Sequence, residues 1–244
     1  MLGISAVRQK QCSGNTLMLP QIPELPDLLL RAVVIIPALT FHEYAHGWAA
    51  YRAGDDTAYR MGRLTLNPLA HLDPIGTIML FLGPIGWAKP VPVNPANLRR
   101  WPKDDILVSV AGVTVNAIQA VVWAILLAVF YRLINRFGGT ANEQQMNFLI
   151  IFKNIAWWGV RLNVALAVFN LIPIPPLDGS HVLGHMLKGE AAERYRQLYR
   201  YGPMLLIIFV AFNLVVPVLS WLIAYVSIPF FMLSDIVERA LFFI

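Results

Sequence analysis

The chain has 244 residues, of which 57% are hydrophobic and only 14% are charged, and its formal net charge is +5. Soluble domains carry about 25% charged residues, so this composition excludes an ordinary soluble domain and favours an integral membrane protein. The basic residues lie in short loops beside apolar runs, as the positive-inside pattern requires, and they form no basic stripe of the kind that binds nucleic acid. The single cysteine, Cys12, excludes an internal disulfide framework.

The first half of the chain begins with a polar to mixed segment, residues 1–27. It has no apolar h-region, so we expect no cleaved signal peptide. The first apolar helix is predicted over Leu28–Ala50, with Pro37 as a kink. The polar connection Arg52–Asp73 follows and contains "GRLTLNP", whose alternating residues predict a short strand over Gly62–Asn67.

The next two apolar runs differ in length. Pro74–Ala88 is uncharged but has only about 15 residues, which is short for a membrane span and favours a re-entrant segment. Lys89–Lys103 reads "KPVPVNPANLRRWPK", and its prolines predict an extended loop. Ile106–Tyr131 has no charged residue and is long enough for a complete span.

The second half of the chain is predicted to hold further membrane helices. Met146–Leu171 is expected to be a helix that "PIPPLDG" interrupts, with a shorter helix after it. Lys188–Arg200 is charged and amphipathic. Tyr201–Ser234 has no charged residue and predicts one helix plus a bent or partial one, with breaks at Pro217 and Pro229.

These segments predict an all-α polytopic membrane protein with five to six membrane segments, including the short re-entrant segment and a small extended element after the first helix. Three parts are expected: the polar segment 1–27, a membrane core over 28–187, and a cytoplasmic amphipathic stretch with C-terminal membrane helices over 188–244. Two crossings separate the basic loops 89–103 and 188–200, so both loops lie on one face, and their lysines and arginines assign that face to the cytoplasm.

A cluster of ionisable residues interrupts the first apolar helix. His42 and His46 are four residues apart in "FHEYAHGWAA", so on a helix both imidazoles lie on one face and can bind one metal ion. Glu43 lies beside them and can reach a metal-bound water, as in the HExxH pattern of zinc metalloproteases. A pair of packed histidines at a helix interface is the structural alternative, but ionisable groups in a membrane segment are usually functional.

A catalytic zinc needs a third protein ligand, and Asp178 in "NLIPIPPLDGSH" is the best candidate. The prolines before it break the helix, and Gly179 allows close approach of the chain. Asp178 could also cap the following helix. His181 is a rival ligand, whereas His185 and His71 are expected to be interfacial or structural.

Several motifs together resemble the site-2 protease family of intramembrane zinc metallopeptidases, peptidase family M50. They are "FHEYAHGWAA", "GRLTLNPLAHLDPIGT", "GWAKPVPVNPANLR", "AGVTVN" and "FNLIPIPPLDGSHVL", which follow the family's order from about residue 38 to 187. Family members often carry a PDZ or CBS domain, and this chain resembles a short form without either.

The resemblance implies one zinc ion per chain, with His42, His46 and Asp178 as ligands and Glu43 as the catalytic base. It also implies that Asn116 and Asn170 polarise the scissile carbonyl or hold substrate. One departure concerns the family's A-G-P-x-x-N motif. Its proline is replaced by valine in "AGVTVN", which affects the expected backbone around Asn116 but not the zinc site.

The predicted function is hydrolysis of peptide bonds in membrane-spanning protein substrates, by a water that the metal activates and Glu43 deprotonates. A substrate helix would have to unwind, and the extended stretch Gly62–Asn67 could pair with it. The expected partners are these substrates and the lipid bilayer, with no nucleic acid, and a homo-oligomer is compatible with the sequence. The expected location is a bacterial or archaeal cell membrane, with the active site nearer the cytoplasm.

Two other functions are compatible with a buried metal site. A metal-ion transporter would need further ionisable residues along its spans, and Ile106–Tyr131 and Tyr201–Ser234 contain none. A non-catalytic membrane protein that recruits partners would not need the glutamate, which is present.

Overall fold

The computed structural model describes residues 25–82, 86–211 and 216–242, and these residues are mostly helical with no β-strand. Residues 1–24, with Cys12 and the expectation about a signal peptide, lie outside them. The helices in chain order are α1 (Leu25–Ala53), α2 (Thr57–Arg60), η1 (Pro68–Ala70), α3 (Pro74–Leu82), η2 (Pro95–Asn97), α4 (Lys103–Phe137), α5 (Glu143–Asn170), α6 (Asp178–Met186), α7 (Gly189–Ala211) and α8 (Val216–Phe242).

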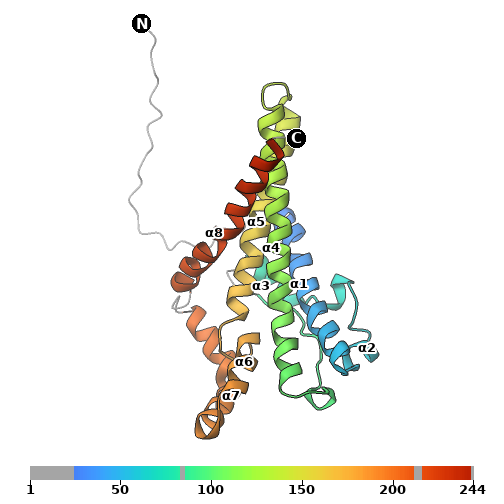
Figure 1. Ribbon diagram of the computed structural model, residues 1–244, viewed down its shortest axis with the longest axis vertical. Coiled ribbons are helices and arrows are strands. Elements are labelled where there is room, and N and C mark those ends of the chain that lie inside the picture. Colours follow the sequence, from blue (N-terminus) through green and yellow to red (C-terminus); the bar gives the residue numbers. More distant parts are fainter. Residues whose placement is uncertain (1–24, 83–85, 212–215, 243–244) are drawn as a thin grey trace.

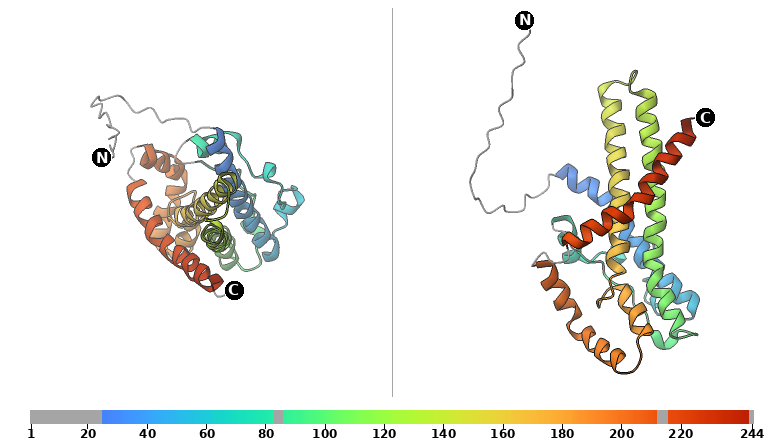
Figure 2. Two further views of the ribbon diagram at one scale, coloured as in Figure 1. Left: turned by 90° about the horizontal axis from the view of Figure 1, so that it is seen from above. Right: turned by 60° about the vertical axis from the view of Figure 1, so that its left-hand side comes forward.

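The two long helices α4 and α5 form an antiparallel hairpin at the centre of the molecule (Figures 1 and 2). Both α1 and α8 contact α4 and α5. The short helix α6 and the start of α7 lie at the end of the hairpin opposite its connecting loop (Figure 1). Helix α6 therefore lies at the same end of the hairpin as the start of α4.

Small side chains allow the hairpin to close tightly. Ala120 on α4 is fully buried against Val160 and Val164 on α5. Gly159 on α5 lies against the indole of Trp123, so a Cβ there would come within 2.3 Å of the ring. Close backbone approach through small residues is the usual way in which helices associate in a membrane.

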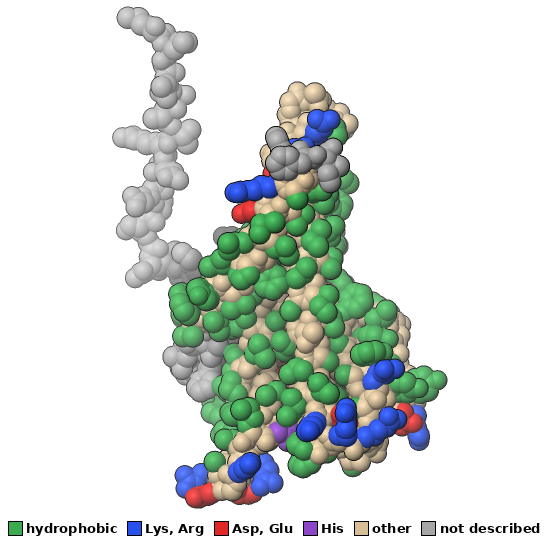
Figure 3. Space-filling view, viewed as in Figure 1, with side chains coloured by type: hydrophobic (Ala, Val, Ile, Leu, Met, Phe, Trp, Pro, Cys, Tyr) green, Lys and Arg blue, Asp and Glu red, His purple; other side chains and the backbone are tan. Residues whose placement is uncertain are grey.

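Four described helices are long and apolar enough to cross a membrane, namely Leu28–Ala53, Lys103–Phe137, Glu143–Asn170 and Pro217–Leu241. Their outer faces expose large apolar side chains, and Figure 3 shows a broad apolar band with charged groups towards both ends. Apolar surface on this scale needs lipid to cover it, so the chain is an integral membrane protein. The predicted count of five to six membrane segments is not confirmed.

The strand predicted over Gly62–Asn67 is absent, because these residues form a turn, two bends and irregular backbone. The polar side chains within the stretch bond locally instead. Thr65 Oγ1 accepts the Asn67 N–H, and Asn67 Oδ1 accepts the Leu69 N–H at the start of η1. Local bonding of this kind competes with pairing into a sheet.

The segment predicted to be re-entrant, Pro74–Ala88, has its two ends next to each other. Its helix α3 has only nine residues, which is too short to span a bilayer. Leu72 and Ala88 form an isolated antiparallel bridge, and the Lys89 N–H donates to the His71 carbonyl oxygen at 2.8 Å. The two ends of the segment therefore lie side by side, as a re-entrant segment requires.

The predicted proline breaks are only partly found. Pro37 and Pro229 lie inside α1 and α8, and both helices continue through them. The prediction that Pro229 ends a helix was wrong, because membrane helices tolerate a proline when neighbouring groups satisfy the freed carbonyl. Pro217 is the second residue of α8, and α7 joins the amphipathic stretch to the apolar run as far as Ala211.

A buried carboxylate ties the proline-rich loop to the end of α1. Asp55 is fully buried and accepts hydrogen bonds from the Thr57 N–H and hydroxyl, the Asn94 N–H at 2.7 Å and the Asn97 side chain at 2.9 Å. Burial alone would raise the pKa of Asp55, but these hydrogen bonds outweigh it and hold the pKa below its ordinary value. The loop is therefore fixed beside α1.

We expect Asp55→Asn to destabilise the folded protein by about 1–3 kcal/mol at neutral pH, because an amide places a donor against other buried donors. The folded-state pKa of Asp55 is depressed, so its contribution is complete above its unfolded pKa of about 3.9. The contribution is lost as the pH falls through the lower folded-state value. Thermal unfolding of the detergent-solubilised protein at neutral and acidic pH measures both effects.

Asp56→Asn is the matched control. Asp56 is only partly buried, and its side chain pairs with the exposed Arg60. Such surface pairs contribute about 0–1 kcal/mol. An equal loss of stability in the two variants would contradict the role given to Asp55.

Candidate metal centre

The two histidines of the HExxH motif lie on one face of α1, in the second half of the helix. Their rings meet edge to face with centroids 4.6 Å apart, and their Nε2 atoms are 3.0 Å apart. His42 is 6% exposed. The four-residue spacing on a helix places both Nε2 atoms towards one point.

The third group comes from a distant part of the chain. Asp178 is the first residue of α6, directly after the proline-rich turn that ends α5. Its Oδ2 lies 3.4 Å from Nε2 of both His42 and His46. Gly179 makes this approach sterically feasible, because a Cβ there would come within 2.3 Å of the Leu171 carbonyl oxygen.

The three converging atoms are suited to a cation. The His46 Nδ1–H donates to the Val108 carbonyl oxygen at 2.8 Å, so in the neutral ring the lone pair is on Nε2. This lone pair faces a second imidazole Nε2 and a carboxylate oxygen that has no hydrogen-bond partner. The mutual distances of 3.0, 3.4 and 3.4 Å are close to the about 3.3 Å between ligands of a tetrahedral zinc with bonds of about 2.0–2.1 Å.

Helix α4 supports the histidine rings from behind. Besides the hydrogen bond from His46 to Val108, it presents Gly112, where a Cβ would lie 2.4 Å from His46 Nε2 and 2.6 Å from His42 Cε1. The sequence patterns did not indicate that Val108 and Gly112 lie beside the site. For Gly112, the regular spacing of small residues along α4 could have indicated a position of close packing.

The glutamate of the motif points to the proline-rich loop. Glu43 is 8% exposed, and its Oε2 accepts a hydrogen bond of 2.9 Å from the Val91 N–H. The loop is held in place by Arg63, which donates to the carbonyl oxygens of Lys89 and Pro90. One carboxylate oxygen of Glu43 is thereby fixed by backbone, 48 residues away in the sequence.

The two asparagines named by the family resemblance occupy different surroundings. Asn116 lies one turn beyond Gly112 on α4 and is fully buried, and neither its Oδ1 nor its Nδ2 has a partner within the described residues. Asn170 ends α5 and donates to the Leu166 carbonyl oxygen at 3.0 Å. Asn163 on α5, which the sequence analysis did not consider, is also fully buried with an unpartnered Oδ1.

The other histidines form hydrogen bonds with groups outside the cluster. His71 is fully buried and bonds through Nε2 to the Thr65 carbonyl oxygen at 2.7 Å. His181 and His185 on α6 both contact Asp105 on α4. Within the described residues, only His42, His46 and Asp178 form a group of three with metal-binding geometry.

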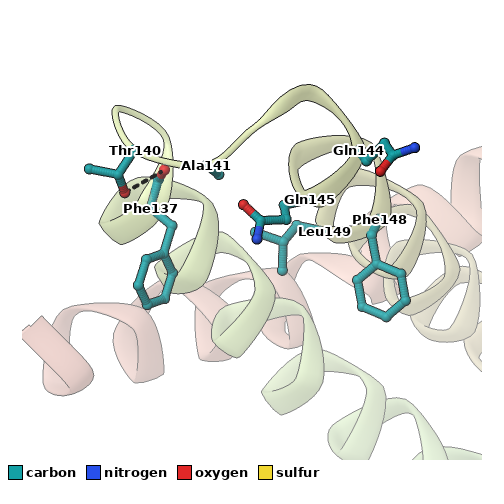
Figure 4. A pocket seen from close by; sticks show the side chains of 7 residues that line it. All are labelled: Phe137, Thr140, Ala141, Gln144, Gln145, Phe148 and Leu149. Carbon is teal, nitrogen blue, oxygen red and sulfur yellow. Dashed lines mark hydrogen bonds between the residues drawn. The ribbon is translucent and has the colours of Figure 1, made fainter.

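One open pocket lies far from these residues, at the loop end of the α4–α5 hairpin. Its volume is about 540 Å³, and Figure 4 shows Phe137 and Phe148 at its two sides, with the Thr140 hydroxyl bonded to the Phe137 carbonyl oxygen. Phe137 is 25 residues beyond Gly112 on α4, which is about 37 Å along the helix. The pocket is therefore not part of the metal centre.

Comparison with known proteins gives a consistent result. The model of peptidase family M50 matches residues 30–212. The chain is 38% identical over 170 residues to "Putative zinc metalloprotease YwhC" of Bacillus subtilis, covering 70% of this chain and 74% of that protein.

Two mycobacterial proteins are also similar. "Putative zinc metalloprotease Rip2" of Mycolicibacterium smegmatis is 30% identical over 179 residues, and that of Mycobacterium tuberculosis is 30% identical over 187. The matches cover 70% and 71% of this chain and 62% and 64% of those proteins. No solved structure matches. The chain belongs to peptidase family M50, the site-2 protease family that its motifs indicated, and it is a zinc metalloendopeptidase.

Proposed function

We propose that the protein is an intramembrane protease that cleaves membrane-helix substrates, with one zinc ion held by His42, His46 and Asp178. The observation that carries this proposal is the convergence of two imidazole nitrogens and one carboxylate oxygen within 3.4 Å of one another. Three protein ligands with a fourth position open to water is the usual arrangement of a catalytic zinc.

The depth of the cluster supports cleavage within the membrane. His46 is seven residues before the end of α1, and Gly112 is nine residues after the start of α4. At 1.5 Å per residue these positions are about 10–14 Å from the helix ends. The basic residues around these ends favour the cytoplasmic side; they are Arg52, Arg60, Arg63, Lys89, Arg99, Arg100 and Lys103.

Glu43 is the proposed general base. Its Oε2 is bound to the Val91 N–H, which leaves Oε1 to accept a proton from the attacking water and return it to the leaving amine. A zinc ion held by the three ligands supplies Lewis-acid polarisation of the substrate carbonyl and lowers the pKa of water. The contact with Val91 restricts the carboxylate to one orientation, which favours proton transfer because geometry limits this step.

Asn116 is the better candidate of the two asparagines for contact with substrate. Its amide is buried one turn from the ring-packing glycine of α4, and both of its polar atoms have no partner within the described residues. A buried unpaired amide is unfavourable by about 1–3 kcal/mol, so a substrate carbonyl or a water would satisfy it. Asn170 lies beside the turn that leads to Asp178, and its Nδ2 donates to the Leu166 carbonyl oxygen.

Metal transport is less well supported. Besides Glu143 at its start, the span α5 contains two ionisable residues, Lys153 and Arg161. Both are cations lying over aromatic rings, those of Tyr131 and Trp157. Cations repel a metal ion and do not form a relay of ligands across a membrane.

Glu43→Gln is expected to retain zinc and to lower the rate of cleavage by at least about 100-fold, because the amide cannot accept the proton. Zinc content by mass spectrometry, and a search for truncated single-span proteins in membranes that contain either enzyme, measure the two effects. Cleavage at the wild-type rate would refute Glu43 as the base, and loss of zinc would show that it acts as a ligand.

Gly112→Ala is expected to weaken zinc binding, because the new methyl group would lie 2.4 Å from His46 Nε2. The zinc content of the purified variant measures this. Gly184→Ala on α6 is the control, since its Cβ would meet its nearest neighbour, Tyr195, at an ordinary 3.5 Å. Full zinc occupancy in Gly112→Ala would show that the histidine rings are not confined by α4.

Val91→Pro tests the contact to the base, because proline removes the N–H from a backbone that prolines already flank. Hydrogen bonds to charged groups contribute about 1.5–3 kcal/mol, so kcat should fall about 10- to 100-fold with KM and zinc content unchanged. Val91→Ala keeps the N–H and should retain activity. Equal kcat values for the two variants would contradict the positioning of Glu43 by Val91.

A further inference from the structure

A second cluster of ionisable residues lies beside the metal centre and has no part in the proposed hydrolysis of peptide bonds. Asp105 on α4 is 5% exposed, and one of its oxygens, Oδ2, contacts two histidines of α6. His181 Nδ1 lies 3.2 Å from this oxygen and His185 Nε2 lies 2.6 Å from it. Because an ionised carboxylate only accepts hydrogen bonds, each histidine donates. We call these three residues the α6 anchor.

The charge of the α6 anchor favours a strong contact. The hydrogen bond from His181 to Asp105 raises the pKa of His181 above its ordinary value and outweighs the opposite effect of burial. Charge-assisted hydrogen bonds are about twice as strong as neutral ones. Asp105 therefore binds α6 through two contacts, one helical turn apart.

The two helices meet along matching stripes. On α6, Asp178, His181 and His185 follow the spacing i, i+3 and i+7, so the zinc-binding carboxylate and both anchoring histidines lie on one face. On α4, Asp105 has the same spacing to Val108 and Gly112, which contact the histidine rings of α1. One face of α4 thus contacts α1 and α6 together.

The helix α6 needs support of this kind. It has nine residues, and an isolated helix of that length is not stable in water. Irregular, proline-rich backbone precedes it, and Gly189, with φ of +59°, follows the two residues after its end. A slip of one residue would rotate Asp178 by about 100° about the helix axis and move its carboxylate away from the histidines.

The neighbouring acid performs a different task. Asp104 accepts the Arg100 N–H at 2.8 Å and pairs with the Arg100 guanidinium at 2.9 Å, so it supports the start of α4. Asp105 has no part in that contact and faces α6 instead. The two adjacent carboxylates therefore provide a matched pair for an experiment.

We propose that Asp105 is a positioning residue of the metal centre, which through His181 and His185 holds α6 at the rotation and height where Asp178 reaches His42 and His46. This inference rests on the proposed zinc site. Residues that orient metal ligands typically change metal affinity by about 10- to 100-fold when they are replaced, and that is the effect we expect here.

The test measures the zinc dissociation constant of the full chain in detergent micelles, by competition with a chromophoric chelator. Asp105→Asn removes the charge and should weaken zinc binding by about 10- to 100-fold. Asp104→Asn, equally buried and one residue away, should bind zinc as the wild type does. Equal zinc affinities for these two variants would overturn the inference.

A second pair of variants separates positioning from general structural damage. His185→Gln keeps an N–H donor at the place of Nε2 and should retain zinc affinity, whereas His185→Leu removes the donor and should lose it. Adding His185→Leu to Asp105→Asn should cause no further loss, because Asp105→Asn already disrupts the contact that His185→Leu removes. Equal losses of zinc affinity in His185→Gln and His185→Leu would contradict the inference, as would fully additive losses in the double variant. The two His185 variants test the inference even if Asp105→Asn fails to fold.

The same measurements distinguish failure of the inference from failure of the proposed function. If the wild type itself binds no zinc, the metal site assigned to His42, His46 and Asp178 is wrong. If the wild type binds zinc and Asp105→Asn binds it equally well, only the role of Asp105 is wrong.

Discussion

The side chains of His42, His46 and Asp178 direct three electron-pair donors towards one point, between the end of α1 and the start of α4. Several other contacts of the structure hold these three groups in position. Two imidazole nitrogens and a carboxylate oxygen within 3.4 Å repel one another unless a cation or a proton lies between them. The contact joins α1 to a residue more than 130 positions later in the chain. Ionisable groups at this depth are unfavourable in lipid, and their convergence therefore supports the proposal that they hold a metal ion.

Helix α4 is the element that makes this arrangement specific. Its first turns contact α6 through Asp105, receive the hydrogen bond from His46 at Val108, and allow the rings to approach at Gly112. Farther along, small residues such as Ala120 let α5 pack closely. The same helix therefore serves the site at one end and membrane packing along its length, because one face carries both kinds of contact.

The sequence predicted what depends on local pattern. The membrane helices around Ile106–Tyr131 and Met146–Leu171 are confirmed because long apolar runs leave few alternatives, and the pairing of His42 with His46 follows from helical spacing alone. The strand predicted over Gly62–Asn67 is not confirmed, because side chains within this stretch form local hydrogen bonds in place of pairing with another strand. The contacts of Asp105 and of the Val91 N–H could not be predicted, since both depend on which distant segments meet, and an acidic pair at a helix start looks like ordinary capping.

X-ray absorption spectroscopy at the zinc edge of the purified protein identifies the atoms that surround the metal. We expect one zinc per chain with nitrogen and oxygen neighbours at about 2.0–2.1 Å, two of them imidazoles, and a changed spectrum in Asp178→Ala. A zinc shell without imidazole, or a spectrum identical in the wild type and Asp178→Ala, would contradict the claim that His42, His46 and Asp178 hold the metal together.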